Sequence, residues 1–156
     1  MTPTDRPGRQ RAGRQEAGRQ GEGLLDTSTV ILLTRIDDAS VLPAYPVISA
    51  VTLAELSVGP LVAGDDRERA ARQAHLQEAE ARFDPLPFDA EAARAFGQVA
   101  ASLRRAGRKT TVRAYDAMIA ATGLARGLPV YTANPDDFDH IDGVDVVAVP
   151  VPPTGP

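Results

Sequence analysis

The chain of 156 residues contains no cysteine. This absence excludes disulfide bonds, cysteine nucleophiles, zinc–thiolate sites and iron–sulfur clusters. No apolar run approaches the roughly 20 residues that span a membrane, and no apolar segment near the start has the form of a signal peptide. With 43% hydrophobic and 24% charged residues, the composition is that of an ordinary globular domain. We therefore expect a soluble, cytoplasmic protein that has no membrane contact.

Histidine and lysine are also scarce. His75 and His140 are the only histidines, and neither has a second histidine at a metal-ligand spacing. No nucleophilic serine motif accompanies them, so a catalytic triad is not indicated. Lys109 is the only lysine. Any chemistry is therefore expected to depend on other polar groups, above all on carboxylates.

The net charge of −4 is unevenly distributed. Residues 1–23 carry five arginines against three acids, or +2, which leaves −6 on the rest of the chain. This segment repeats Gly-Arg-Gln and has almost no apolar side chains, so we expect a disordered Gly/Arg/Gln-rich tail. Residues 24–150 form the predicted domain, and 151–156 a proline-rich C-terminal tail. An acidic domain is compatible with an acidic pocket that a metal ion neutralises.

Short apolar runs alternate with helical patterns along the domain. Strands are predicted at 24–25, 47–49, 130–132 and 144–149. Helices are predicted at 29–35, 51–58, 65–82, 89–107 and 113–127. Ser28 or Thr27 is the expected N-cap of the first helix, and Ser49 or Thr52 that of the second. The alternation predicts an α/β fold with a mainly parallel sheet flanked by helices.

Acidic residues lie at or soon after the ends of these strands. Asp26 follows the first strand directly, and an acidic loop at 134–137 follows the third. Glu55 and Asp116 lie in helices close after such edges. The carboxyl ends of parallel strands converge in space, and carboxylates gathered there raise one another's pKa or bind a cation. Mg²⁺ and Mn²⁺ prefer such oxygen ligands, although Asp26 as a helix cap and Glu55 as a solvent-facing side chain are simpler interpretations.

One basic cluster interrupts the acidic domain. It comprises Arg104, Arg105, Arg108 and Lys109, with Arg113 just beyond. These side chains are able to bind phosphate groups, which makes Arg108, Lys109 and Arg113 candidate RNA-binding residues. A helix C-terminus also favours cations through its dipole, which accounts for part of the cluster without any ligand.

Four motifs occur in order along the domain. They are Leu-Leu-Asp-Thr-Ser at 24–28, Ile-Ser-Ala-Val-Thr-Leu-Ala-Glu-Leu at 48–56, Asp-Ala-Met-Ile-Ala-Ala at 116–121 and Tyr-Thr-Ala-Asn-Pro-Asp-Asp-Phe at 131–138. Together they resemble PIN-domain ribonucleases, specifically the VapC-type toxins of bacterial VapBC toxin–antitoxin modules. The resemblance implies a PIN-like fold and a Mg²⁺- or Mn²⁺-dependent endoribonuclease. It also implies a homodimer and a VapB-type antitoxin partner, whose binding groove would include the helix at 65–82.

The resemblance also implies roles for individual residues. Asp26, Glu55 and Asp116 take the first three acidic positions, with Asp26 and Asp116 as direct metal ligands and Glu55 acting through water. Asp137 is the best candidate for the fourth catalytic acid, followed by Asp136, because Asn134 stands where many members have an aspartate. Thr27 and Ser28 would orient Asp26.

Two other functions are compatible with parts of this pattern. A catalytically inactive PIN fold that serves as a protein-binding module is one of them, and Asn134 favours it slightly. A receiver-like phosphoacceptor domain is the other. It requires a lysine near the end of the domain, whereas Lys109 lies in the basic cluster.

Overall fold

The computed structural model describes residues 21–153. Its centre is a sheet of four parallel strands, namely β1 (Glu22–Leu25), β2 (Tyr45–Ile48), β3 (Val130–Thr132) and β4 (Val146–Ala148), in the order β2-β1-β3-β4. The expected α/β fold with a small parallel sheet is therefore confirmed. Most of the predicted N-terminal tail and the end of the C-terminal tail, 154–156, lie outside the described residues.

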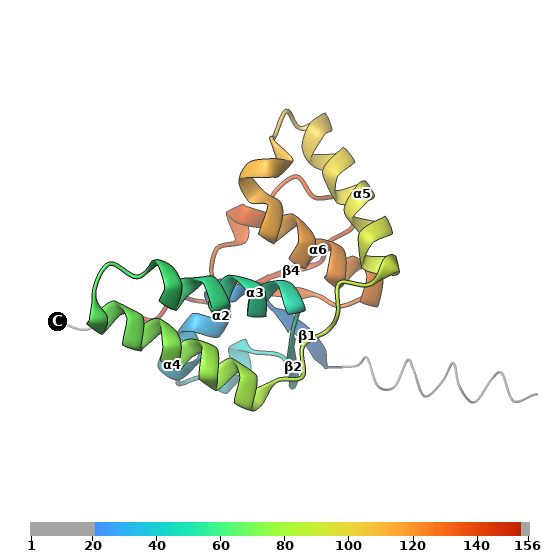
Figure 1. Ribbon diagram of the computed structural model, residues 1–156. Helices are drawn as coiled ribbons and strands as arrows, with labels where there is room; N and C mark the ends of the chain where they lie inside the picture. The colour runs from blue at the N-terminus through green and yellow to red at the C-terminus, as the bar shows by residue number, and fades with distance from the viewer. Residues whose placement is uncertain (1–20, 154–156) are drawn as a thin grey trace, which may run out of the picture.

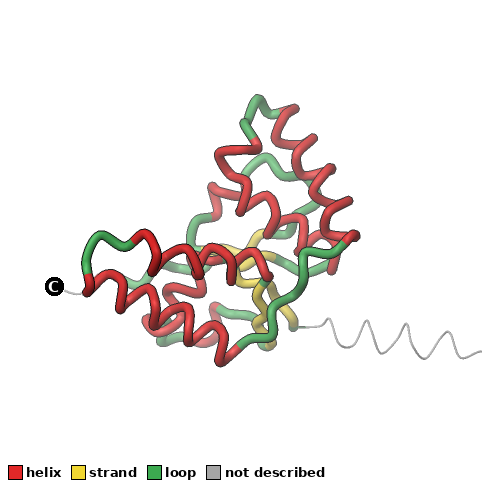
Figure 2. Tube along the Cα trace, viewed as in Figure 1, coloured by secondary structure: helices red, strands yellow, loops and turns green. Residues whose placement is uncertain are grey.

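Helices cover both faces of the sheet. They are α2 (Thr27–Leu32), α3 (Ala50–Val58), α4 (Asp66–Arg82), α5 (Ala90–Arg105) and α6 (Ala114–Arg126). Short 3₁₀ turns connect them: η1 (Leu33–Arg35), η2 (Ala39–Val41), η3 (Gly59–Val62), η4 (Thr110–Arg113) and η5 (Pro135–Phe138). Figure 1 shows α3 and α4 as one antiparallel pair and α5 and α6 as another. The strands lie between the two pairs, as the yellow segments of Figure 2 show.

The core consists of two apolar clusters, one on each face of the sheet. Successive side chains of a strand point to opposite faces, so the fully buried Leu24 and Leu25 of β1 belong to different clusters. Leu24 packs with the α5 and α6 residues, including Val99 and Ile119. Leu25 packs with residues of α2, α3 and α4. A strand buried on both faces reads as a continuous apolar run, which is why two leucines precede Asp26.

Glycine is required at Gly23, where β1 passes close to two other segments. A Cβ atom at this position would lie 2.5 Å from the ring of Tyr131 and 2.7 Å from Cβ of Pro43. Gly127 has a different role, because its left-handed backbone (φ +63°) ends α6 and turns the chain toward β3. Both glycines help to bring β1 and β3 together.

Several predicted boundaries differ from the observed ones. The first helix begins at Thr27 rather than residue 29, because Asp26 and not Ser28 or Thr27 is its N-cap. After Leu32 the chain continues as a 3₁₀ turn and not as the α-helix predicted up to residue 35. The predicted strand at 24–25 starts two residues late, since β1 begins at Glu22. β2 lies earlier than the predicted 47–49, and Ser49 is the N-cap of α3, as one of the two expected alternatives. Within residues 21–153, no helix combines the length and the apolar character needed to cross a membrane.

Candidate active site

The site lies at the carboxyl ends of the two central strands. Asp26 follows β1, and Thr132 is the last residue of β3. The strands are paired with Leu25 opposite Tyr131, and the backbone N–H of Asp26 donates to the carbonyl oxygen of Tyr131 at 3.1 Å. This register places the Asp26 and Thr132 side chains next to each other. Asp26 is therefore fixed by the sheet itself and not only by the helix that it caps.

The Asp26 carboxylate is buried, with 3% of the residue exposed, and it is fully engaged. Its Oδ1 accepts from the backbone N–H of Thr29 at 2.9 Å, which is the helix-capping bond. Ser28 Oγ lies 2.8 and 2.9 Å from the two carboxylate oxygens. Thr132 donates to Oδ2 at 2.6 Å. A buried charge needs such partners, and three donors around one carboxylate hold it in a single orientation.

The two hydroxyl donors are themselves oriented by the loop after β3. The backbone N–H of Ala133 donates to Ser28 Oγ at 3.2 Å, and that of Asn134 donates to Thr132 Oγ1 at 2.9 Å. Because each hydroxyl accepts from an amide, its own proton points toward Asp26. Thr132 thus links Asp26 to the acidic loop. The sequence did not reveal this contact, because a threonine at the end of a strand is an ordinary β-branched residue.

Glu55 reaches the site from α3. Thr27 of α2 donates to Glu55 Oε1 at 2.7 Å and also lies 3.1 Å from Thr52 Oγ1. Burial raises the pKa of Glu55, the bond from Thr27 lowers it, and the negative charge of Asp26 raises it again. Glu55 therefore does not simply face solvent, and Thr27 contacts Glu55 rather than orienting Asp26 as expected.

Asp116 lies in the first turn of α6. Its pKa is raised to about 6, first by burial and then by the charges of Asp137, Glu55 and Asp26. Arg113 acts in the opposite direction. Four carboxylates from four separate segments are thus close enough to influence one another, as expected for a convergent strand edge.

The three candidates for the fourth position lie in different surroundings. Asp137, in η5, is the acid whose charge acts most strongly on Asp116. Asp136 is exposed, and its carbonyl oxygen accepts from Arg113. Asn134 is also exposed, and its carbonyl oxygen accepts from the backbone N–H of Asp137 at 3.0 Å. Of the three, only Asp137 is among the charges that act on the pKa of Asp116.

Comparisons with known proteins show the family of this chain. The family model of the PIN domain matches residues 24–144. The chain belongs to the PIN domain family. Ribonuclease VapC5 of Mycobacterium tuberculosis is 40% identical over 129 residues, which cover 81% of this chain and 93% of the relative. The tRNA(fMet)-specific endonuclease VapC of Shigella flexneri is 34% identical and covers 78% and 92% of the two chains.

A solved structure shows the same likeness. The crystal structure of VapBC-5, a member of the VapBC family of toxin–antitoxin systems from Mycobacterium tuberculosis, superposes with a TM-score of 0.71. It is 37% identical to this chain and covers 83% of it and 99% of the matched chain. The resemblance to VapC-type proteins that the four motifs indicated is therefore confirmed.

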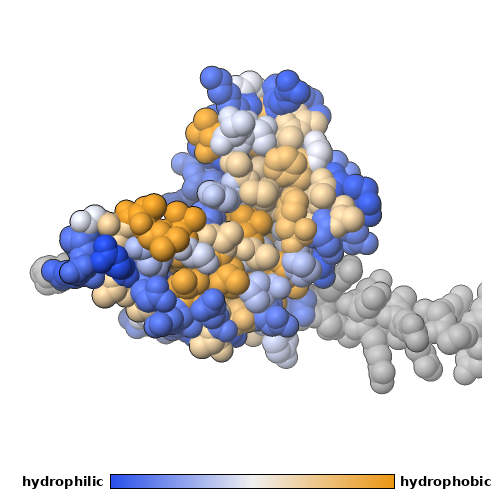
Figure 3. Space-filling view, in the orientation of Figure 1, coloured by the Kyte–Doolittle hydropathy of each residue, from blue (hydrophilic) through white to orange (hydrophobic). Residues whose placement is uncertain are grey.

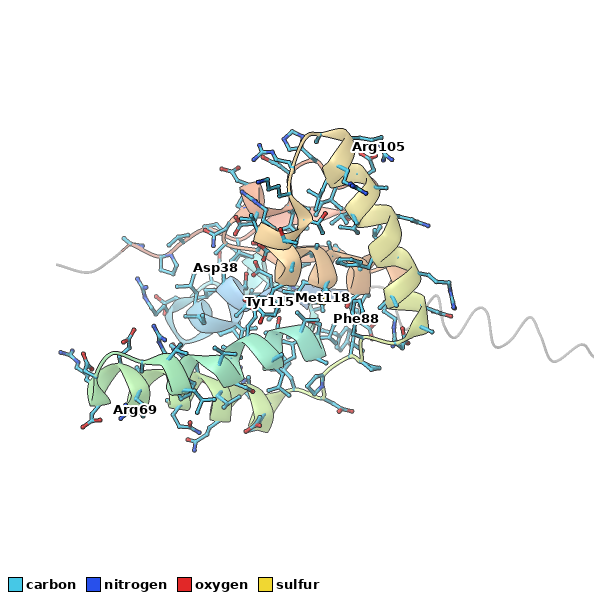
Figure 4. All side chains as sticks on the ribbon, turned by 45° about the horizontal axis from the view of Figure 1, so that its top comes forward. Asp38, Arg69, Phe88, Arg105, Tyr115 and Met118 are labelled. Carbon is cyan, nitrogen blue, oxygen red and sulfur yellow. The ribbon has the colours of Figure 1, made fainter. Side chains whose placement is uncertain are left out.

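A groove opens beside Glu55 in this PIN domain. It has a volume of about 280 Å³ and is lined by Thr27, Ile31, Glu55, Leu56, Gly59, Arg72 and His75. Figure 3 shows apolar surface above the end of α3 and η3, where Val58, Leu61 and Val62 are exposed. In Figure 4, Tyr115 and Met118 of α6 lie between α6 and α3. An acidic site next to apolar surface is suited to a protein partner.

The basic residues divide into two groups. Arg108 and Lys109 are exposed, and Arg108 Nη2 lies 3.4 Å from Nε2 of His140. Arg113 is instead partly buried and pairs with Asp137 at 3.3 Å. Among residues 21–153, therefore, only two of the three candidate RNA-binding residues are exposed and have no carboxylate partner.

The donor set suits a hard divalent cation. It consists of carboxylates and hydroxyls without thiolate or imidazole. The pKa values of Glu55 and Asp116 are raised first by burial and then by neighbouring negative charges, and a cation would offset that repulsion. Among residues 21–153, no three acidic or histidine side chains already stand in a metal-holding arrangement.

Proposed function

We propose that this protein is the toxin of a type II toxin–antitoxin system and acts as a divalent-metal-dependent endoribonuclease. The observation that carries the proposal is the convergence of Asp26, Glu55, Asp116 and Asp137 at one edge of a PIN-domain sheet, where burial and the neighbouring charges raise the pKa of Asp116. The names of the relatives support it, since they are a ribonuclease and a tRNA(fMet)-specific endonuclease. The proposed substrate is RNA, and the proposed bond is a phosphodiester.

The proposed mechanism assigns separate tasks to the acids. Asp26 and Asp116 would hold Mg²⁺ or Mn²⁺, which supplies a Lewis acid for the developing negative charge on the phosphate. Burial raises the pKa of Glu55, which suits this residue to accept a proton from the attacking water. Asp137 would fill the fourth position. Ser28 and Thr132 keep Asp26 in a fixed orientation, and Thr27 does the same for Glu55.

Arg108 and Lys109 are the proposed contacts for RNA. Both are exposed, so their charges are available to phosphate groups. They precede η4, the turn that leads into α6 and Asp116. RNA held by these two residues would continue toward the acidic edge.

The proposed protein partner is a VapB-type antitoxin, and the proposed assembly of the toxin is a homodimer. The related solved structure is a member of the VapBC family of toxin–antitoxin systems. The groove beside Glu55 and the exposed apolar residues of α3 and η3 offer a surface that such a partner would cover. An antitoxin bound there would block access to the acids.

The test is cleavage of total RNA by the purified protein with Mg²⁺ or Mn²⁺. Asp116→Asn and an EDTA-treated sample serve as inactive comparisons, and Asp84→Asn, which changes an exposed acid in the loop before α5, serves as the matched control. We expect discrete fragments from the wild type and the control only. No cleavage, together with no metal binding in titration calorimetry, would favour the alternative of an inactive PIN fold that binds proteins.

A further inference from the structure

Arg113 connects two segments that carry acids of the site. It is the last residue of η4 and the N-cap residue of α6, the helix whose first turn holds Asp116. Its Nη1 atom lies 3.0 Å from the carbonyl oxygen of Asp136 and 3.3 Å from Oδ1 of Asp137. One guanidinium therefore joins the start of α6 to η5, through both the backbone and a side chain.

We propose that Arg113 is a positioning residue that holds Asp137 beside Asp116, rather than a contact for RNA phosphate. The inference rests on the proposed function, in which both acids serve the nuclease site. Carboxylates close together repel each other, so a segment that carries one of them needs a restraint. A guanidinium that binds the backbone of η5 as well as its carboxylate provides that restraint, because it limits movement of the whole turn.

The surroundings of Arg113 argue against a direct RNA contact. Its side chain is only 31% exposed, and the same Nη1 group contacts both the Asp136 carbonyl and the Asp137 carboxylate. Arg108 and Lys109, by contrast, are exposed. A phosphate would therefore have to compete with Asp137 for Arg113. Within residues 21–153, Arg108 is not paired with any carboxylate, so a phosphate that binds Arg108 meets no such competition.

The chain offers a matched control at the other end of the same helix. Arg126, the last residue of α6, pairs with Asp89 at 3.1 Å, and the two side chains are 32% and 39% exposed. The corresponding values for Arg113 and Asp137 are 3.3 Å, 31% and 40%. Arg126→Ala thus removes an ion pair of the same kind and burial without touching the acidic edge.

The experiment is a double-mutant cycle of Arg113→Ala and Asp137→Asn, with Arg126→Ala and Arg113→Lys alongside. RNA cleavage and Mn²⁺ affinity by calorimetry are measured on every protein, and circular dichroism verifies folding. We expect Arg113→Ala to lower kcat about tenfold with KM unchanged, and to lower it less than about twofold in the Asp137→Asn background. Arg113→Lys should recover part of the loss, and Arg126→Ala should cleave as the wild type does.

The direction of the change in Mn²⁺ affinity of Arg113→Ala distinguishes lost positioning from a simple loss of charge. Removing a positive charge near the acids would by itself tighten Mn²⁺ binding, so weaker binding in Arg113→Ala is the signature of lost positioning. Tighter Mn²⁺ binding by Arg113→Ala, or equal losses of kcat in both backgrounds, would overturn this inference but not the proposed function. So would a raised KM together with a salt dependence of RNA binding reduced by about 0.7, the value for one lost phosphate contact. Wild-type protein that neither cleaves RNA nor binds Mn²⁺ would overturn the proposed function as well.

Discussion

Asp116→Asn is expected to stabilise the metal-free protein while it abolishes nuclease activity. The pKa of Asp116 rises from 3.8 to about 6 on folding, mainly through burial and then through the charges of Asp137, Glu55 and Asp26. The difference corresponds to about 3 kcal/mol, at about 1.4 kcal/mol per pH unit. Because water reaches part of this side chain and screens the charges, we expect a gain of about 2 kcal/mol at pH 8.

The pH dependence follows from the direction of this pKa change. Between pH 3.8 and about 6, folded Asp116 holds a proton that the unfolded chain has released, so the stability it contributes falls as the pH rises through that window. The full cost is present above about pH 6 and absent below pH 3.8. Asparagine does not titrate, so its advantage over the wild type should shrink to roughly a third at pH 4.5.

Urea unfolding of chelator-treated protein at pH 8 and pH 4.5 measures both values. Hydrogen bonds are not among the causes that act on the Asp116 pKa, so asparagine loses no favourable acceptor contact that would obscure the result. Asp84→Asn, in an exposed loop, is the control and should change stability by less than about 0.5 kcal/mol at either pH. No gain for Asp116→Asn at pH 8, or an equal gain at both pH values, would refute the electrostatic reasoning.

Three further results are expected. Thr132→Val keeps the side-chain shape but removes a hydrogen bond to the buried Asp26 carboxylate, so urea unfolding should show a free energy of unfolding lower by about 2 kcal/mol. The loss should be smaller in an Asp26→Asn background, and an equal loss in both backgrounds would contradict a role for this hydrogen bond. Replacing Arg108 and Lys109 by alanine should reduce the salt dependence of RNA binding by about 0.7 per lost phosphate contact, and an unchanged slope would exclude them. Mn²⁺ at about a hundredfold excess over its Kd should stabilise the wild type by about 2.7 kcal/mol and Asp116→Asn by less, and equal melting shifts would argue against Asp116 as a ligand.

The sheet and the acids were predictable from the sequence for one physical reason. Parallel strands buried on both faces read as short apolar runs, and polar residues that follow such runs lie at one edge. Asp26 directly after Leu24 and Leu25, and the acidic loop directly after β3, are the simplest examples. To predict Asp116 as a site residue, it was enough that its helix begins close to that edge.

The contacts between the acids and their partners were not predictable in the same way. Asp26, Thr27 and Ser28 are all competent N-caps, and only the course of the chain as it leaves β1 selects Asp26. A threonine at the end of a strand is ordinary for β-structure, so the role of Thr132 depends on the pairing of β1 with β3. Arg113 reads as one more basic residue, because its partner lies 24 positions away in η5.

The two proposed metal ligands are held in opposite ways, and the difference suggests how their tasks divide. Asp26 accepts from a backbone amide and two oriented hydroxyls, so its carboxylate is fixed before any ion arrives. Asp116 has burial and like charges around it, which raise its pKa, so its ionised form is disfavoured in the metal-free protein. A cation would therefore bind a rigid carboxylate at Asp26, next to the sheet, and would relieve the repulsion at Asp116, in α6. Under the proposed function, Asp26 would therefore set where the ion sits, and Asp116 would contribute much of the gain in free energy on binding.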